Sequence, residues 1–360
     1  MRTKVNFAIQ DLVESHGADN AALVVRDLVQ EKKVDLNSLS LKGIWEACQK
    51  AEGLSIDVQE AVVSYSFPKI TGELINAKVI EGYEGIQLIG DTLVTTLPAR
   101  HRVETFAGFT AVDAPDEVGE TEEYSQTSLT EKYVQITSKK YGEMIYISEE
   151  MIFFDQTGQI INRANEIGRL AAQWRERLIM RAIQDLDTTA YYPSGTATAI
   201  YSAANDNLIT TMPFGESGME GLKIRMQRQK SDALGHADDN FIFINPADLV
   251  VLVPADLEVE ALQLANSVLV PESAENAVNI FKGMFKPVTS PYISVQSPTT
   301  WYAGDFKRDF VWAEVWPLQT ISMRPGSSVE FTRDIKAGMK VRFFGGAGAL
   351  DTKHVFKLTA

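Results

Sequence analysis

The strongest hydrophobic pattern in the chain runs along "DQTGQIINRANEIGRLAAQWRERLIMRAIQDLD", residues 155–187. Apolar residues recur there at alternating spacings of four and three, which places them on one side of a helix. The pattern predicts one helix of about 45–50 Å at 1.5 Å per residue, longer than most helices of soluble proteins. We expect it to be a spine whose buried stripe contains Ile160, Ala164, Ile167, Ala171, Trp174 and Leu178.

Two segments rich in aromatic and β-branched residues precede this helix, at 103–113 and 131–148, and they predict two strands. The segment between them, 112–131, carries seven acidic residues and no basic one. We name this segment the tongue. The pattern predicts a long hairpin with a large acidic tip.

The other parts of the chain have weaker patterns. Residues 1–61 predict short helices, and the proline- and glycine-interrupted segment 62–103 predicts an extended arm with one short helix. Further helices are expected within 219–235 and 256–267, and strands are expected at "DFVWAEVW", at "QTISMRP" and in a β-meander near the end. Two glycine-containing stretches are expected to be a loop and a turn. "GESGM" is one residue short of the nucleophile elbow G-x-S-x-G, and "FFGGAGALD" lacks the Lys-Ser/Thr of a phosphate-binding loop.

Composition narrows the class of protein. With 360 residues and 45% hydrophobic content, the chain can form a core in one to three domains. It has no run of eighteen apolar residues, so no transmembrane helix is expected. Its formal charge of −14 argues against direct wrapping of nucleic acid, and a single cysteine, Cys48, fits a reducing cytoplasm.

The sequence offers no persuasive catalytic, cofactor or metal site. The four histidines, His16, His101, His236 and His354, are far apart and form no metal-ligand motif, so we expect exposed or hydrogen-bonded side chains. Cys48 lies in a helical pattern and is expected to be a small buried residue. The carboxylates of the tongue lie on a polar loop, which favours a solvated charge run over a catalytic pair. We expect no enzymatic activity.

The order of these parts resembles the major capsid proteins of tailed bacteriophages, which have the Hong Kong 97-type fold. The resemblance is carried by "EKYVQITSKKYGEMIYISEEMI", "FDQTGQIINRANEIGRLAAQWRERLI" and "VRFFGGAGALDTKHVFKL", and it covers about residues 62–360. It implies an α+β capsid fold. The parts would be an N-terminal helical segment (1–61), an N-terminal arm (62–103), a β-hairpin E-loop (104–148), a P-domain with the spine helix (149–189), a central A-domain (190–318) and closing P-domain strands (319–360).

The resemblance also implies a function. The chain would self-assemble into pentamers and hexamers of an icosahedral head shell that encloses the phage genome without sequence-specific binding. It would belong to the virion and be assembled in the bacterial cytoplasm, with scaffold, portal and decoration proteins as further partners and no membrane. Covalent cross-linking of the shell is not expected, because the tongue contains no lysine.

The tongue would then lie across an adjacent subunit. The acids expected at this interface are Glu117, Glu120, Glu122 and Glu123, and the candidate partners on the spine helix are Arg163, Arg169, Arg175 and Arg177. Two alternatives stay open at this point. One is an encapsulin-like compartment of the same fold, and the other is a carboxylate-based hydrolase with the tongue as a lid.

Overall fold

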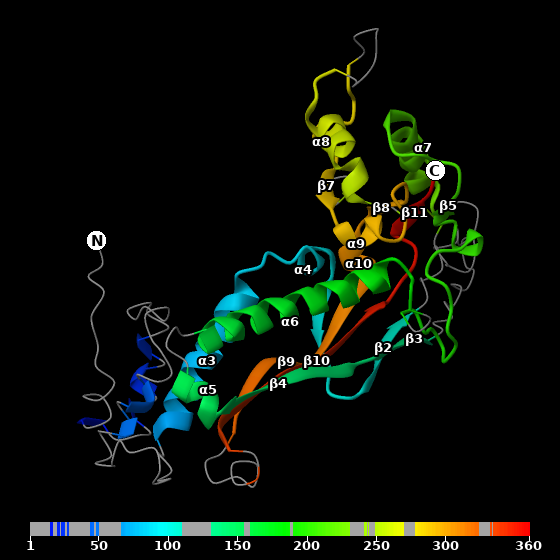
Figure 1. The fold of residues 1–360 in the computed structure, drawn as a ribbon. Coiled ribbons are helices and arrows are strands. Elements are labelled where there is room, and N and C mark those ends of the chain that lie inside the picture. Colours follow the sequence, from blue (N-terminus) through cyan, green and yellow to red (C-terminus); the bar gives the residue numbers. More distant parts are fainter. Residues whose placement is uncertain are drawn as a thin grey trace. The chain divides into compact units, whose positions relative to one another are not determined.

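The chain forms two compact units, seen in the computed structural model of Figure 1. The first comprises Met1–Gln87, Lys140–Arg175 and Trp316–Phe344, and the second comprises Leu88–Lys139, Glu176–Val315 and Gly345–Ala360. The structure describes residues 66–109, 131–154, 159–187, 190–230, 241–242, 244, 249–269, 278–323 and 334–360, with single residues or short groups between 15 and 49 and at 332.

The first unit begins with a helix where we predicted a mostly extended arm. Helix α3, Ser66–Glu84, has 19 residues and places Phe67, Ile70, Leu74 and Val79 in the core. Its buried side also carries Thr71, Gly72 and Lys78, and Ile80 is exposed, so the apolar residues of the sequence do not repeat with a clear helical period. Pro68 is tolerated because it lies in the first turn, where no backbone donor is needed.

The predicted spine is helix α6, Gln159–Ile183, which follows the short helix α5, Glu149–Phe154. The helix is confirmed, although residues 155–158 of the predicted range lie outside the described residues. Within the first unit, α6 and α3 touch through their backbones. A Cβ added at Gly168 would lie 2.0 Å from the Val79 carbonyl oxygen, and one at Gly82 would lie 2.1 Å from the Asn165 carbonyl oxygen.

Strands β9 (Phe310–Ser322) and β10 (Ile335–Ala349) are the central strands of a sheet with the order β1-β9-β10-β4. We predicted two strands where β9 is one. In the first unit, β4 (Lys139–Ser148) lies beside β10, and Ile147, Met339 and Val341 enter the same core as α3. We also predicted one strand over 131–148. The structure has two strands there, separated at the buried Ser138, and β4 belongs to a different sheet from the strand that ends at Thr137.

The glycine-rich stretch "FFGGAGALD" is a strand and not the turn that we predicted. It forms the end of β10, and its glycines in the second unit lie against neighbouring chain segments. A Cβ at Gly345 would lie 2.4 Å from the buried Trp312 ring, and one at Gly346 would lie 2.6 Å from the Thr137 carbonyl oxygen. These glycines therefore allow close packing, which local sequence cannot distinguish from a turn.

The second unit is built on a five-stranded mixed sheet with the order β5-β11-β8-β6-β7. Its strands are β5 (Leu208–Ile209), β6 (Val250–Val253), β7 (Lys286–Thr289), β8 (Trp301–Gly304) and β11 (Val355–Leu358). The central strands carry fully buried residues, including Trp301 and Phe356. Because both faces are covered, these strands lack a polar alternation.

Two helices add apolar residues to this core: α7, Glu216–Arg228, and α8, Glu258–Asn266. Helix α7 starts inside "GESGM", so our prediction of a loop there is wrong. The shorter elements of the unit are α4 (Gly90–Leu93), β1 (Thr95–Pro98), η2 (Ala203–Asn205), η4 (Ala255–Leu257), α9 (Pro291–Ser294) and α10 (Phe306–Asp309).

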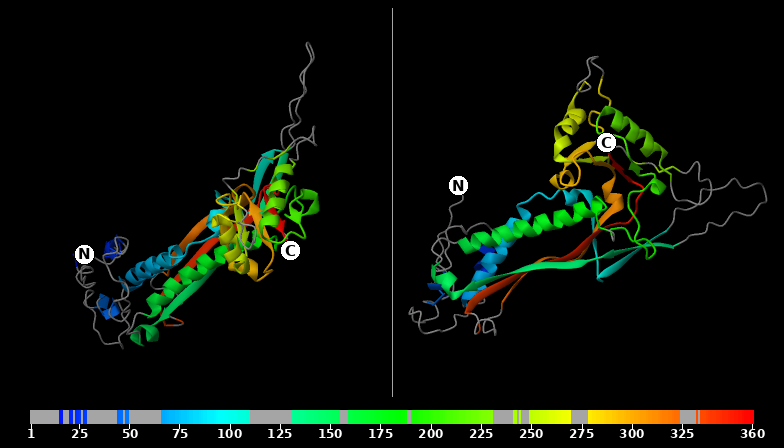
Figure 2. Two further views of the ribbon diagram at one scale, coloured as in Figure 1. Left: turned by 90° about the horizontal axis from the view of Figure 1, so that it is seen from above. Right: turned by 45° about the vertical axis from the view of Figure 1, so that its right-hand side comes forward.

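The predicted hairpin is present in the second unit. Strands β2 (Val103–Phe109) and β3 (Glu131–Thr137) pair antiparallel over seven residues, from Val103↔Thr137 to Phe109↔Glu131, and Figure 2 shows them as a ribbon. One side of β3 is held by hydrogen bonds from the Gln135 amide to the Tyr192 carbonyl and from the Ser194 amide to the Tyr133 carbonyl.

Candidate functional site

The arginines that we predicted at a subunit interface lie along α6. Arg163, Arg169 and Arg177 are exposed, within an arc of about 120° at 3.6 residues per turn. Arg175 differs, because its side chain is half-buried and donates a 3.0 Å hydrogen bond to the Tyr83 hydroxyl of α3. Arg175 is therefore engaged within the first unit, and the side chains of the other three are exposed to solvent.

The predicted apolar stripe of α6 is displaced by about one position. Trp174 is 41% exposed, so our prediction that it is buried in the core is wrong, while Ile167 and Leu178 are half-buried and the side chain of Ile160 lies outside the described residues. The buried positions are Ala164, which was predicted, together with Gly168, Ala172, Glu176, Ile179, Met180, Ala182 and Ile183. Small residues face α3 because the backbones touch there, and this displaces the large side chains to the flank.

Trp174 belongs to an apolar groove in the first unit, between α6 and strands β4 and β10. Its ring lies 6.2 Å from that of Tyr141, which stacks at 5.3 Å on Phe343. Leu170 and Arg342 also line the groove, which has a volume of about 400 Å³. The groove places an apolar surface beside the exposed arginines Arg163 and Arg169.

The acids that we predicted opposite these arginines lie outside the described residues; they are Glu117, Glu120, Glu122 and Glu123. The structure describes the two strands that hold them. Apart from the bonds between β3 and residues 192–194, no further chain segment pairs with β2 or β3 among the described residues. A two-stranded ribbon alone is marginally stable in water. Its base packs on the second unit through Ile136 and Phe106, whereas Thr105, Ala107 and Tyr133 towards the tongue are exposed.

The structure brings together two side chains that the sequence did not connect, Asp309 and His354. The Asp309 carboxylate is fully buried and accepts a 2.8 Å hydrogen bond from His354 Nδ1 and further bonds from the amides of His354 and Val355. His354 thus has a hydrogen-bond partner, as we predicted, and His16 and His101 are exposed, whereas His236 lies outside the described residues. No sequence pattern links two residues 45 positions apart.

Asp351 completes a group of three that a cation could use, because its carboxylate lies 3.9 Å from His354 Nδ1. Both oxygens of Asp309 already accept hydrogen bonds, however. The group therefore fits a buried ion pair that ties the β10–β11 connection to the start of β9. Burial lowers the pKa of His354, but the hydrogen bond and charge of Asp309 outweigh it and raise the pKa overall. Burial raises the pKa of Asp309.

We expect this pair to make the stability depend on pH. A raised pKa means that the folded protein favours protonated His354, so the stabilisation is complete below the ordinary value of 6.5 and is lost as pH rises through the folded-state value. Thermal unfolding from pH 6 to pH 9 measures this loss. His354→Asn should flatten this decline, whereas His101→Asn, at an exposed position, should leave it unchanged. Equal slopes in all three proteins would contradict the prediction.

Comparison with known proteins decides the family. A sequence profile described as phage capsid protein matches residues 131–358, well over half of the chain. The chain belongs to this phage capsid protein family. No curated protein sequence matches it significantly.

Solved structures agree with the fold of a capsid protein. One is from the mature capsid of bacteriophage PhiM1, with 11% identity, a TM-score of 0.50, and coverage of 76% of this chain and 87% of that chain. Another is from the capsid of cyanophage Pam1, with 10% identity, a TM-score of 0.50, and coverage of 73% and 87%. The predicted α+β, Hong Kong 97-type fold is thereby confirmed, while our six-part division remains a prediction.

The family membership gives this capsid protein a structural role in the phage head. It also favours the phage head over the encapsulin-like compartment that the sequence left open. Among the described residues, no helix is long and apolar enough to cross a membrane.

Proposed function

We propose that this capsid protein assembles into pentamers and hexamers, and that these close into the icosahedral shell around the phage genome. The observation that carries the proposal is the β2–β3 hairpin in a chain of this family, because the outer edge of β2 has no strand partner among the described residues. Copies related by rotation can supply that partner, and a head-to-tail contact of this kind closes into rings.

The proposed contact is between the tongue of one subunit and α6 of the next. The tongue carries seven acids and no base, while Arg163, Arg169 and Arg177 are exposed on α6. Opposite charges on different parts of one chain attract between copies. These charges also favour the arrangement in which the tongue of one copy meets α6 of another, because two acidic tongues or two arginine-bearing helices would repel each other.

The remaining partners follow from the same role. The shell would be assembled in the host cytoplasm with scaffold, portal and decoration proteins. It would enclose DNA without reading its sequence, since the chain carries a formal charge of −14 and cannot neutralise many phosphates.

Electron microscopy and light scattering of the purified protein test the proposal. We expect capsomer rings or closed shells above a critical concentration. Shells purified from infected cells should contain DNA. A stable monomer of 39.9 kDa at every concentration would contradict assembly, and an enclosed enzyme in place of DNA would favour the compartment.

We expect the tongue to act between subunits. Changing Glu117, Glu120, Glu122 and Glu123 together to Gln should leave the melting temperature of the subunit nearly unchanged. Exposed ion pairs contribute about 0–1 kcal/mol each, so the loss of the four acids that face three arginines should raise the critical concentration for assembly about tenfold. High salt should do the same to the unchanged protein, because it screens exposed charges.

A second variant shows whether the arginines are the partners. Changing Arg163, Arg169 and Arg177 to Gln should raise the critical concentration as the tongue variant does, and combining both sets should add little, because the same contact is already lost. Fully additive effects would mean that the two surfaces act separately. Equal critical concentrations for the tongue variant and the unchanged protein at low salt would disprove the contact.

A further inference from the structure

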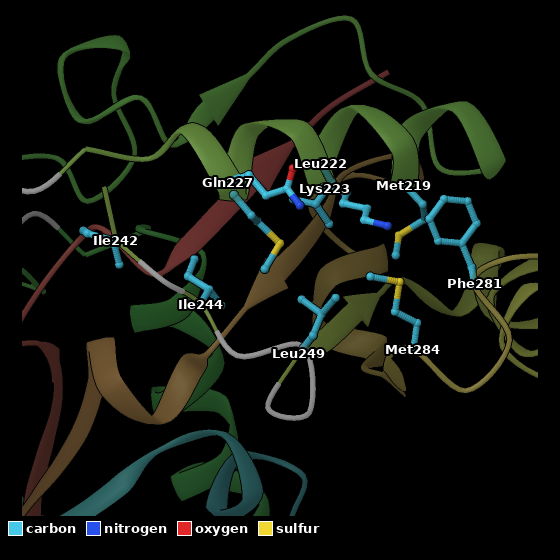
Figure 3. A pocket seen from close by; sticks show the side chains of 10 residues that line it. Met219, Leu222, Lys223, Gln227, Ile242, Ile244, Leu249, Phe281 and Met284 are labelled. Atoms are coloured by element: carbon cyan, nitrogen blue, oxygen red, sulfur yellow. The ribbon is translucent and has the colours of Figure 1, made fainter. Parts of the chain in front are cut away.

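The second unit has an apolar groove that the tongue contact does not use. It lies beside α7 and has a volume of about 430 Å³. Figure 3 shows Met219 from α7 and Met284 and Leu249 from the opposite side pointing into it. Methionine side chains adapt to the shape of an inserted group, so such a groove suits an apolar side chain from outside.

The surroundings of the groove are mainly basic. Lys223 lines it, and Lys282 is exposed next to Phe281, which also lines it. Lys286 is exposed as well, and its amide is hydrogen-bonded to the carbonyl of Leu249. One acid, Glu220, is exposed on the same helix. A partner that combines apolar side chains with acidic ones would fit both features.

The same unit carries a surface of that kind on α8. Val259 is 68% exposed and Leu262 is 45% exposed, one turn apart on the helix. Asp256 and Glu258, just before them, are exposed acids. Glu260 is different, because it lies against Gly215 at the start of α7 of its own subunit.

The two surfaces cannot meet within one subunit. The opposite side of α8 carries Ala261, Leu264 and Ala265, which are buried in the same cluster as Phe281. In a helix the side chains of Val259 and Leu262 therefore point away from this cluster. Only another copy of the chain can bring its α8 into the groove.

We propose that Val259 and Leu262 of one subunit insert into the α7 groove of a neighbouring subunit, with Asp256 and Glu258 beside its lysines. The contact joins two different surfaces, so it is head-to-tail and can close a ring. This inference rests on the proposed assembly function and gives it a second contact, independent of the tongue.

Two variants remove the two sides of this contact separately. Val259→Asp with Leu262→Asp removes the inserted side chains, and Lys223→Glu with Gln227→Glu makes the groove wall acidic. All four positions are exposed, so both proteins should melt like the unchanged one. Each variant alone should require at least a tenfold higher concentration to form capsomers. Val295→Asp, at an exposed valine of the same unit, is the matched control and should assemble normally.

Mixing the variants gives the decisive result. The groove variant keeps its α8 surface and the α8 variant keeps its groove, so an equimolar mixture contains one intact pairing. We expect dimers with one copy of each variant in sedimentation experiments, at concentrations where each variant alone is monomeric. No dimers in the mixture, or an equal loss of assembly in Val295→Asp, would overturn the proposal.

The outcome also separates this contact from the proposed function. If the unchanged protein does not assemble, the proposed function fails. If the unchanged protein and both variants assemble at the same concentration, only the α8 contact is overturned. A groove variant that assembles normally alone but fails with a purified scaffold protein would likewise overturn it, and would assign the groove to the scaffold.

Discussion

Gly168→Leu should prevent the capsid protein from accumulating in soluble form. Helices α3 and α6 touch at this position, since a Cβ would lie 2.0 Å from the Val79 carbonyl oxygen. That oxygen belongs to the backbone, so no side-chain rotation can make room, and a leucine must push the helices apart. Overpacking of a core costs about 1–3 kcal/mol and occasionally more. We expect a loss of about 3 kcal/mol, a large fraction of the stability of an ordinary domain.

Soluble yield and thermal unfolding measure this effect. Gly82→Leu should act in the same way, because it meets the Asn165 carbonyl oxygen from the other helix. Asn162→Leu is the control, since it places the same side chain at an exposed position of α6. If Gly168→Leu melted at the temperature of the control, the close approach of the two helices would be wrong.

The second large effect is expected at Asp309. Replacing this fully buried carboxylate by leucine leaves the amides of His354 and Val355 and the ring nitrogen of His354 without their acceptor. Breaking a buried pair by removing one partner costs about 3–5 kcal/mol. Asp309→Leu should therefore lower the free energy of unfolding by about that amount. It should also remove the decline of stability with rising pH, because burial lowers the pKa of His354 once the carboxylate is gone.

Asp351→Asn is the matched control for Asp309→Leu. Its carboxylate lies 3.9 Å from the same histidine nitrogen but is partly exposed. Such a contact contributes about 0–1 kcal/mol, so this variant should remain close to the unchanged protein in denaturant unfolding. If the two variants lost the same stability, the buried hydrogen bonds of Asp309 would not be the cause.

The predictions from sequence succeeded where the pattern is long and local. The spine helix was predicted because its apolar residues repeat over many turns, and the hairpin because two alternating segments flank an acidic one. The buried side of the helix was predicted about one position away from its true place. The hydrophobic pattern places Trp174 on the buried side because its side chain is large. In the structure, Gly168 lies against α3, and the small residues Ala164 and Ala172 are buried instead of Trp174. The contact partner decides this, and a single helix does not reveal its partner.

The failures share a related cause. Helix α3 carries polar and glycine residues, such as Lys78 and Gly72, on its buried side and Ile80 on its exposed side, so its sequence lacks the period that would mark a helix. The glycines of β10 indicate a turn locally, but Gly345 is needed because the Trp312 ring lies against the strand. The pair of Asp309 and His354 depends on chain segments brought together only by folding. Each of these features is set by distant residues and not by neighbours in the sequence.

The pairing of β2 with β3 has a consequence for how such chains can change. Seven residue pairs fix the register, and a slip of one residue would turn every side chain to the other face. For any loop between two paired strands, doubling the number of residues adds only about 0.6 kcal/mol of closure entropy. A foreign peptide added between β2 and β3, outside the stretch from Glu117 to Glu123, should therefore leave the register unchanged, and it would be displayed on every subunit of a particle.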